Sequence, residues 1–355
     1  MKNFWKGKKV LITGHTGFKG SWLTFWLKHL GAEIYGYSLP PENRISLFDI
    51  LQLEKNIHSS EFGDILEKKT FKNYVIKSNP EVIFHLAAQP LVIESYNNPL
   101  KTIETNVSGT ANILNFADEL KYLKSLVIIT SDKCYQNYER EDPYTEDDRF
   151  GGDDIYSASK ACAEIITSAY RKSFYADKKA FIATARAGNV IGGGDWSKYR
   201  LIPDIIDSLN SKENLEIRFP NATRPWQHVL EPLNGYLQLA KNLYEKGNTF
   251  SGGWNFGPDV EGIVSVREIL DISEEILGIG LNAVISDKEE FHESSLLSLD
   301  CEKAKKKLGW KPKLSLKKAL EFTFDWHDAY KNKMDMKKIT LDQIHKYQKE
   351  KFNEN

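Results

Sequence analysis

A glycine-rich turn near the start of the chain constrains the fold more than any other feature. Residues 10–22 read VLITGHTGFKGSW, which places Gly14, Gly17 and Gly20 directly after an apolar run. Glycine lets a backbone turn tightly and approach a phosphate, and a following helix presents free N–H groups there. Large apolar residues then repeat at helical spacing: Phe18, Trp22, Phe25, Trp26 and Leu30. The strand, loop and helix together predict that a dinucleotide binds at this turn.

Strand-like and helical patterns alternate through the first half of the chain. This alternation predicts an α/β fold, a Rossmann-type doubly wound parallel sheet whose ligands lie outside the carboxyl ends of the strands. Buried strands are predicted at 8–14, 32–39, 81–88, 125–131 and 179–192, with helical stretches such as 100–120 between them.

The regular alternation loosens after about Gly188, where glycine, proline, tryptophan and arginine gather in loops. We therefore expect a smaller mixed C-terminal domain that holds the substrate. The expected division is a dinucleotide-binding domain at 1–187 with return segments about 226–257, a substrate domain at 188–225 and 258–330, and a charged, solvated helical tail at 331–355.

Composition and charge exclude several classes of protein. The chain has 355 residues, a formal net charge of −1 and three scattered cysteines without a C-x-x-C pair. Balanced charge argues against nucleic acid or a membrane surface as a partner, and the cysteines argue against a disulfide framework or a metal site. No apolar run reaches the ~18 residues of a spanning helix, and the basic start lacks an apolar signal core. We expect a cytoplasmic protein without a metal.

Tyr156 and Lys160 stand four residues apart, so they share one face of a predicted helix. A tyrosine with its ordinary pKa of ~10 is a poor base at neutral pH. A neighbouring ammonium and a cationic nicotinamide ring both favour the phenolate and lower that pKa. Since the pair follows a dinucleotide loop in a chain of alternating strands and helices, it predicts redox chemistry with a nicotinamide cofactor.

The residues after the second predicted strand leave the choice of nicotinamide cofactor open. That strand ends in YSL, where an acidic residue for the ribose hydroxyls of NAD is usual. Ser38 can hydrogen-bond the ribose instead, and Arg44 lies nearby in the sequence. Asp64 and Ile65 can contact the adenine or form a plain turn. NAD is expected, and NADP stays an alternative.

From about Lys8 to Trp310 the chain resembles the extended short-chain dehydrogenase/reductase superfamily. The glycine loop and the Tyr156–Lys160 pair carry the resemblance, and the segments LAAQ (86–89), TS (130–131) and RAGNV (186–190) support it. The resemblance implies a homodimer or homotetramer, joined through helices near 101–120 and 156–175. The cofactor contacts that it implies are Gly14, Thr16, Gly17, Phe18, Gly20, Ser38, Asp64, Ile65, Leu86, Ala87, Ala88, Asn106, Thr130, Tyr156 and Lys160.

The strand at 125–131 runs directly into Ser131-Asp132-Lys133, which puts two ionisable side chains beside the predicted Tyr156 helix. The resemblance narrows here to the nucleotide-sugar 4,6-dehydratases, which use such a pair to expel a hydroxyl as water between two hydride transfers. Their dTDP-glucose and GDP-mannose branches typically carry Asp-Glu at this place, whereas Asp-Lys resembles the CDP-glucose branch. Longer segments indicate the same branch: 14–23, 87–96, 131–137, 188–196, 200–204 and 224–233.

The resemblance implies a role for each residue of the site. Tyr156 is the base at the carbon-4 hydroxyl, with Lys160 as its partner, and Ser131 or Thr130 hydrogen-bonds that oxygen. Asp132 protonates the leaving hydroxyl. Lys133 takes the proton from carbon 5, since burial can lower the pKa of a lysine. With CDP-glucose as the expected substrate, the implied substrate contacts are Gln89, Asn189, Arg200, Arg224 and His228.

Two other functions stay open from the sequence. A related epimerase, dehydratase or reductase that acts on a dTDP-, UDP- or GDP-sugar would share the fold and the Tyr156–Lys160 pair. A catalytically silent dinucleotide-binding protein would share the loop but would not need Asp132 and Lys133. Arg224, assigned above to the substrate, can also simply pack an irregular loop.

The sequence also predicts whether three aromatic residues of the first strand-loop-helix unit are exposed or buried. His15 is expected to be exposed or in weak contact with the cofactor. Trp22 and Trp26 repeat with the helical apolar pattern, so both are expected in the core.

Overall fold

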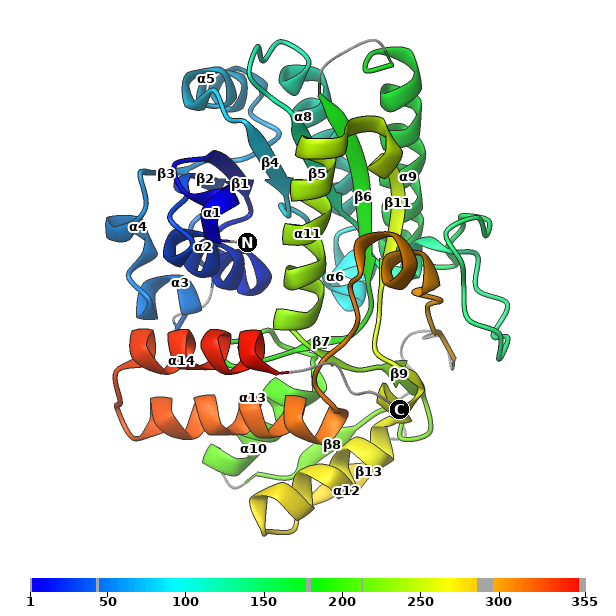
Figure 1. Cartoon of the computed structure of the whole chain (residues 1–355). Coiled ribbons are helices and arrows are strands. Elements are labelled where there is room, and N and C mark those ends of the chain that lie inside the picture. The colour runs from blue at the N-terminus through cyan, green and yellow to red at the C-terminus, as the bar shows by residue number, and fades with distance from the viewer. Residues whose placement is uncertain (1, 43–44, 177–179, 212, 286–295, 351–355) are drawn as a thin grey trace.

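The computed structural model describes residues 2–42, 45–176, 180–211, 213–285 and 296–350. Within these residues, seven strands form one sheet in which every neighbouring pair is parallel, so the predicted Rossmann-type doubly wound parallel sheet is confirmed (Figure 1). From edge to edge the strands are β11 (Gly252–Phe256), β6 (Phe181–Ala187), β5 (Ser125–Ile129), β4 (Val82–His85), β1 (Lys9–Thr13), β2 (Glu33–Ser38) and β3 (Ser59–Phe62).

Helices cover both faces of the sheet because the strand side chains alternate between two cores. Val10 and Ile12 of β1 point into one core and Leu11 into the other, and all three are fully buried. The chain changes direction across the sheet between β1 and β4, where sheets of this kind bind their ligands. The first core is covered by α2 (Phe18–His29) and α11 (Leu230–Lys246), and the second by α5 (Lys68–Ser78), α8 (Gly109–Ala117) and α9 (Ile155–Ser173).

A second, smaller part of the chain, in the lower half of Figure 1, has its own apolar core. Ile202, Ile205, Ile269 and Leu320 lie buried at its centre. Its elements are α10 (Leu201–Ser211), α12 (Val266–Leu277), α13 (Leu316–Lys331) and three short strand pairs: β7 (Val190–Ile191) with β10 (Gln227–His228), β8 (Leu215–Ile217) with β13 (Ala283–Ile285), and β9 (Thr223–Pro225) with β12 (Ile263–Ser265). The exact division into domains stays a prediction.

Short helices complete the structure. They are α1 (Lys2–Trp5), α3 (Leu47–Ile50), α4 (Leu53–Asn56), α6 (Val92–Asn97) and α7 (Pro99–Ile103). Within the described ranges, the structure has no helix that is both long and apolar enough to cross a membrane.

The last helix, α14 (Met336–Lys349), corrects one expectation. A helix is present in the predicted tail, but it is not solvated, because Ile344 and Tyr347 are buried. The indole Nε1 of Trp326 donates to Thr340 at 3.0 Å, and Tyr347 packs edge-on against Trp26 of α2. A lysine-rich sequence hid this packing, since the apolar positions of α14 are few and widely spaced.

Candidate active site

The glycine loop has the shape that a pyrophosphate requires. Gly14 takes a φ of +75°, and a Cβ there would lie 2.7 Å from the backbone nitrogen of Ala87. A Cβ on Gly20 would collide with the carbonyl oxygen of Gly14, so both positions need glycine. A Cβ on Gly17 would meet only that carbonyl oxygen, at 3.5 Å, which leaves open space before the first turn of α2. The loop therefore fits a dinucleotide at a helix N-terminus.

The hydroxyls beside the loop hydrogen-bond each other. Thr16 Oγ1 lies 2.8 Å from Ser38 Oγ and donates to the carbonyl oxygen of Leu39 at 2.9 Å. Ser38 is thereby held at the end of β2, where it can reach a ribose. Arg44 lies outside the described residues. At the next strand end, Asp64 accepts a hydrogen bond from the backbone N–H of Leu66, which is the geometry of a turn.

Ile65 and Asn106, two of the predicted cofactor contacts, are buried and make hydrogen bonds within the protein. Ile65 is buried, and its carbonyl oxygen accepts from Asn112. Asn106 accepts a hydrogen bond from the N–H of Gln89 at 2.8 Å and donates to Ser159 of α9 at 2.9 Å. It braces the segment after β4, which includes Leu86, Ala87 and Ala88, against the helix that carries Tyr156.

Gln89 does not have the free amide that a substrate contact needs. Its Nε2 donates to Leu91 O at 3.0 Å and to Thr102 at 2.9 Å, and its Oε1 accepts from the N–H of Leu91. These bonds use both amide hydrogens, so Gln89 shapes the loop between β4 and α6.

Ser131 and Asp132 form a compact unit at the carboxyl end of β5. Ser131 Oγ donates to Asp132 Oδ1 at 2.9 Å, and the backbone N–H of Lys133 donates to the same oxygen at 2.9 Å. Asp132 is almost fully buried, and burial raises the pKa of its carboxyl group although Lys133 and Ser131 oppose the rise. Burial therefore shifts this carboxyl group toward the protonated form that a proton donor requires.

Tyr156 and Lys160 lie buried on the first turns of α9, which Asp154 caps by accepting from the N–H of Ser157. Burial raises the pKa of Tyr156 to about 12, while Ser131 and the charge of Arg200 oppose this rise. Burial lowers the pKa of Lys160 to about 8. The Lys160 amine lies 5.9 Å from the centre of the Tyr156 ring. The two side chains share a helix face, as the spacing predicts.

The structure distinguishes between the two hydroxyls considered for the carbon-4 oxygen. Thr130 donates to the buried carboxylate of Glu164 at 2.5 Å, so its hydrogen is used within the protein. Ser131 is the hydroxyl beside the Tyr156 phenol. Arg186, from the predicted segment at 186–190, pairs with Glu164 at 2.8 Å and is equally buried, so it supports the site from within the protein.

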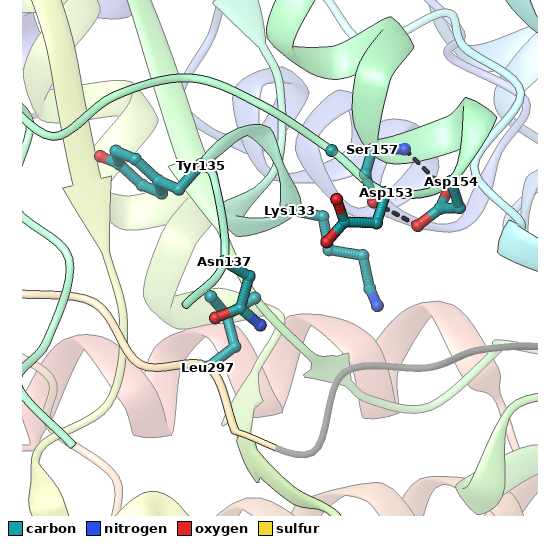
Figure 2. Close-up of a pocket in the computed structure, with 8 residues that line it drawn as sticks. Lys133, Tyr135, Asn137, Asp153, Asp154, Ser157 and Leu297 are labelled. Atoms are coloured by element: carbon teal, nitrogen blue, oxygen red, sulfur yellow. Dashed lines mark hydrogen bonds between the residues drawn. The ribbon is translucent and has the colours of Figure 1, made fainter. Parts of the chain in front are cut away.

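Lys133 extends into a pocket at the mouth of the site (Figure 2). Figure 2 shows the Lys133 side chain together with Asp153 and Asp154, which come just before α9 and line the same pocket. Asp153 is exposed, whereas Lys133 is half-buried. The pocket is lined by Lys133, Tyr135, Asn137, Gly152, Asp153, Asp154, Ser157 and Leu297.

The residues predicted to bind the substrate diphosphate differ in how deeply they are buried. Arg200 is half-buried and pairs with Asp195 at 2.8 Å, and Asn189 lies on the neighbouring loop, where its carbonyl oxygen accepts from Gln227. Arg224 is buried on β9, and its Nη1 donates to Thr223 O at 3.0 Å.

Two histidine expectations are wrong for the same reason, which is burial. His228 is fully enclosed between the rings of Trp22 and Phe322, and burial lowers its pKa to about 3, so it packs the core instead of meeting a phosphate. His15 is also fully buried, with its Nε2 2.8 Å from Ser60 Oγ. Trp22 lies in the core, as expected.

Lys19 lies in electrostatic contact with residues of the candidate site and was not predicted from the sequence. It stands between Phe18 and Gly20 on the first turn of α2 and is half-buried. Burial lowers its pKa to about 8, Arg200 lowers it further, and Asp132 opposes the change. The signal was a lysine inside the glycine loop, where the helix N-terminus already carries partial positive charge.

Known proteins with similar sequences and structures are nucleotide-sugar enzymes. The CDP-glucose 4,6-dehydratase of Salmonella typhimurium is 46% identical over 340 residues, which cover 94% of each chain. The solved dTDP-glucose 4,6-dehydratase of Bacillus anthracis in complex with NAD has a TM-score of 0.76 at 20% identity and covers 92% of this chain and 99% of its own. The UDP-glucose 4-epimerase of Thermotoga maritima with UDP-glucose has a TM-score of 0.79 at 21% identity, covering 90% and 99%.

The family model for GDP-mannose 4,6-dehydratase matches residues 11–323, which include the glycine loop, the Ser131-Asp132-Lys133 triplet and the Tyr156–Lys160 pair. With this match and the 46% identical relative, the chain belongs to the GDP-mannose 4,6-dehydratase family.

Proposed function

We propose that the protein is an NAD-dependent hydro-lyase that converts CDP-glucose into CDP-4-keto-6-deoxyglucose and water. The observation that carries the proposal is the grouping of Ser131 and Asp132 at the end of β5 with Tyr156 of α9, where burial raises the pKa of Asp132. The identity to the Salmonella relative supports the choice of CDP-glucose.

The residues around the glycine loop fit NAD. Gly17 leaves open space before the first turn of α2, and Ser38 is a neutral group held where a ribose hydroxyl would lie. Lys160 is proposed to hydrogen-bond the nicotinamide ribose from α9. Bound NAD would accept a hydride from carbon 4 of the sugar, return it to carbon 6 and favour the Tyr156 phenolate through its cationic ring.

The protein's own groups move the protons. Tyr156 takes the proton of the carbon-4 hydroxyl while Ser131 hydrogen-bonds the same oxygen. The carbonyl at carbon 4 acidifies carbon 5, and the amine of Lys133 removes that proton. Asp132 gives its proton to the carbon-6 hydroxyl, which leaves as water. Lys133 then returns a proton to carbon 5, and the proton on Tyr156 replaces the one that Asp132 gave up, so only water is lost.

The nucleotide part of the substrate is proposed to lie against the loops of the smaller part of the chain. The guanidinium groups of Arg200 and Arg224 suit a phosphate because each can offer two N–H groups, and Asn189 is proposed to join them. Gln89 and His228 are left out of this proposal, because the Gln89 amide is bonded within its own loop and the His228 ring is fully buried.

The test is incubation of the enzyme and NAD with CDP-glucose, followed by NMR of the sugar and absorbance of NADH. We expect a 4-keto-6-deoxy product without net NADH, and weaker turnover with dTDP-, UDP- and GDP-glucose. Formation of the carbon-4 epimer alone would instead support the epimerase alternative. Bound cofactor without turnover of any sugar nucleotide would support a silent dinucleotide-binding protein.

We further propose a cytoplasmic homodimer or homotetramer, joined through helices near 101–120 and 156–175. Exposed apolar side chains support this surface: Leu100, Ile103 and Ile165 are 74%, 40% and 53% exposed. Light scattering of the purified protein would give the mass, and a monomer would contradict the proposal.

A further inference from the structure

We propose that Asp195 is a positioning residue that holds the Arg200 guanidinium beside Tyr156, so that Arg200 serves the base as well as the substrate. The kinetic part of this inference rests on the proposed function. The structural part concerns the ionisation of the Tyr156 phenol and does not depend on the proposed function.

The Asp195–Arg200 ion pair has the geometry of a fixed support. Arg200 Nη1 lies 2.8 Å from Asp195 Oδ2, and the Asp195 side chain is 5% exposed whereas that of Arg200 is 31% exposed. The other carboxylate oxygen of Asp195 accepts from the N–H of Ser197 at 3.0 Å. Asp195 is therefore held on one side by its own loop, and it presents its second oxygen to an arginine at the edge of the site.

The loop that carries Asp195 is anchored on both sides. Trp22 Nε1 donates to the carbonyl oxygen of Gly193 at 2.9 Å, and a Cβ on Gly193 would collide with the ring of Trp326. Gly194 takes a φ of +82°, which favours glycine. Trp196 packs edge-on against Trp326, with ring centres 5.8 Å apart. These contacts join the loop to α2 and α13, so Asp195 has little freedom to move.

Arg200 is in turn fixed at the start of α10. Its carbonyl oxygen accepts from the N–H of Asp204 at 3.0 Å, in the pattern of a first helical turn. The backbone therefore places residue 200, and the ion pair selects one direction for its long side chain. Arginine has many rotamers, and an unpaired arginine would spend much of its time in other directions.

The charge of Arg200 acts on the Tyr156 phenol in the direction that favours the phenolate and lowers its pKa. The charges of Asp132 and Asp154 act in the opposite sense on the phenol, and Lys160 lies 5.9 Å from the ring centre. Without a nearby cation, a buried tyrosine flanked by two carboxylates would be a poor base. Among the described residues, the titratable groups around Tyr156 include Asp132 at the end of β5, Asp154 and Lys160 of α9, Arg200 before α10 and Tyr236 of α11.

The experiment measures the ionisation of residue 156 directly in the NAD-bound enzyme. Tyr156→3-fluorotyrosine gives a more acidic phenol that is visible by fluorine NMR, and its pKa is compared with and without Asp195→Asn. If Asp195 positions Arg200, its loss lets the cation move away and the phenol pKa rises by about one unit or more. If Arg200 stays in place, removal of a carboxylate lowers the phenol pKa, which contradicts the proposal.

An unchanged phenol pKa with a lower melting temperature would also contradict it, because Asp195 would then support the fold alone. Arg200→Gln should raise the phenol pKa as well, and the two changes together should raise it by less than their sum. Asp148→Asn is the matched control, since it breaks an ion pair of the same 2.8 Å length with Arg140 outside the site. It should leave the phenol pKa unchanged.

A second readout uses the reaction. In the Asp195→Asn variant the acidic limb of the kcat/KM profile for CDP-glucose should move to higher pH by the same amount as the phenol pKa. If the enzyme does not act on CDP-glucose at all, the proposed function fails, while the NMR result still decides the role of Asp195.

Discussion

Asp132 and Glu164 are buried carboxylates near the same end of β5, yet the pKa values of the two groups move in opposite directions. Glu164 accepts from Arg186, Thr130 and Thr184, and these partners outweigh burial and lower its pKa. Asp132 accepts from a hydroxyl and a backbone N–H and feels the charge of Lys133, but burial prevails and its pKa rises. The surroundings thus favour the anion at Glu164 and shift Asp132 toward the protonated form.

Asp132→Asn should block loss of the carbon-6 hydroxyl but leave removal of the carbon-5 proton possible. The amide keeps the size of the side chain but gives no proton, so we expect turnover of CDP-glucose to fall by about a hundredfold or more. In the proposed mechanism Tyr156 and Lys133 act before Asp132, so CDP-glucose recovered from heavy water should still gain deuterium at carbon 5, as NMR would show.

The controls for this prediction remove the earlier steps. Tyr156→Phe should lose both turnover, by about a hundredfold, and deuterium exchange. Lys133→Met should lose exchange as well. Exchange that persists in the Lys133→Met variant would show that another group removes the carbon-5 proton.

At the scale of elements, one buried ion pair joins helix α9 to two neighbouring strands of the large sheet. Glu164 of α9 pairs with Arg186 of β6 through two bonds of 2.8 and 2.9 Å, and it accepts from Thr130 at the end of β5. Arg186 also lies over the rings of Tyr135 and Phe150. The pair keeps α9, and with it Tyr156, in register with the strand that carries Ser131.

Glu164→Gln should destabilise the protein strongly, because it leaves the Arg186 charge buried without its anion. We expect the free energy of unfolding in urea to fall by about 3–5 kcal/mol. Glu164 has a lowered pKa, so the stability from this pair is present above the ordinary glutamate pKa and is lost as pH falls through the lowered value. Glu275→Gln, which breaks an exposed pair with Lys317, should cost less than about 1 kcal/mol. Equal losses for the two variants would contradict this prediction.

At the scale of the whole molecule, α14 joins the two parts of the chain. Tyr347 packs on Trp26 of the large sheet's helix α2, while Gln343 donates to Phe322 O in α13 at 2.6 Å. Both parts meet at Glu231, which accepts from Tyr347 at 2.8 Å and from the backbone N–H groups of Lys313 and Leu314 at 2.8 Å. Figure 1 shows α14 lying along α13.

Glu231 should make the stability of this joint depend on pH. Burial raises its pKa to about 7 from an ordinary value of 4.5, so its favourable contribution is full below the ordinary value and is lost as pH rises to about 7. We expect the wild type to lose about 2 kcal/mol between about pH 5 and about pH 8 relative to Glu231→Gln, measured by urea unfolding. Glu245→Gln, at the exposed end of the same helix, should show the pH dependence of the wild type. If the Glu231→Gln variant lost as much stability as the wild type over this pH range, this role of Glu231 would be ruled out.

Much of the site could be predicted because its residues lie in local patterns. Gly14, Gly17 and Gly20 lie within one turn, Tyr156 and Lys160 on one helix face, and Ser131 and Asp132 at the end of one strand. The supports of the site could not be predicted in this way. Thr130 turns to Glu164, and Gln89 to Leu91, and these directions depend on partners far away in the chain or on the folded loop.

The amino-acid sequence by itself determined the parallel sheet, the dinucleotide loop and the set of proposed catalytic groups, because apolar periodicity and short spacings are local properties. Only the tertiary structure decided which polar groups are buried. It placed His15 and His228 in the core, brought Lys19 and Arg200 toward Asp132 and Tyr156, and packed α14 across both parts. Burial and long-range charge contacts depend on the packing of distant segments, so no local pattern records them.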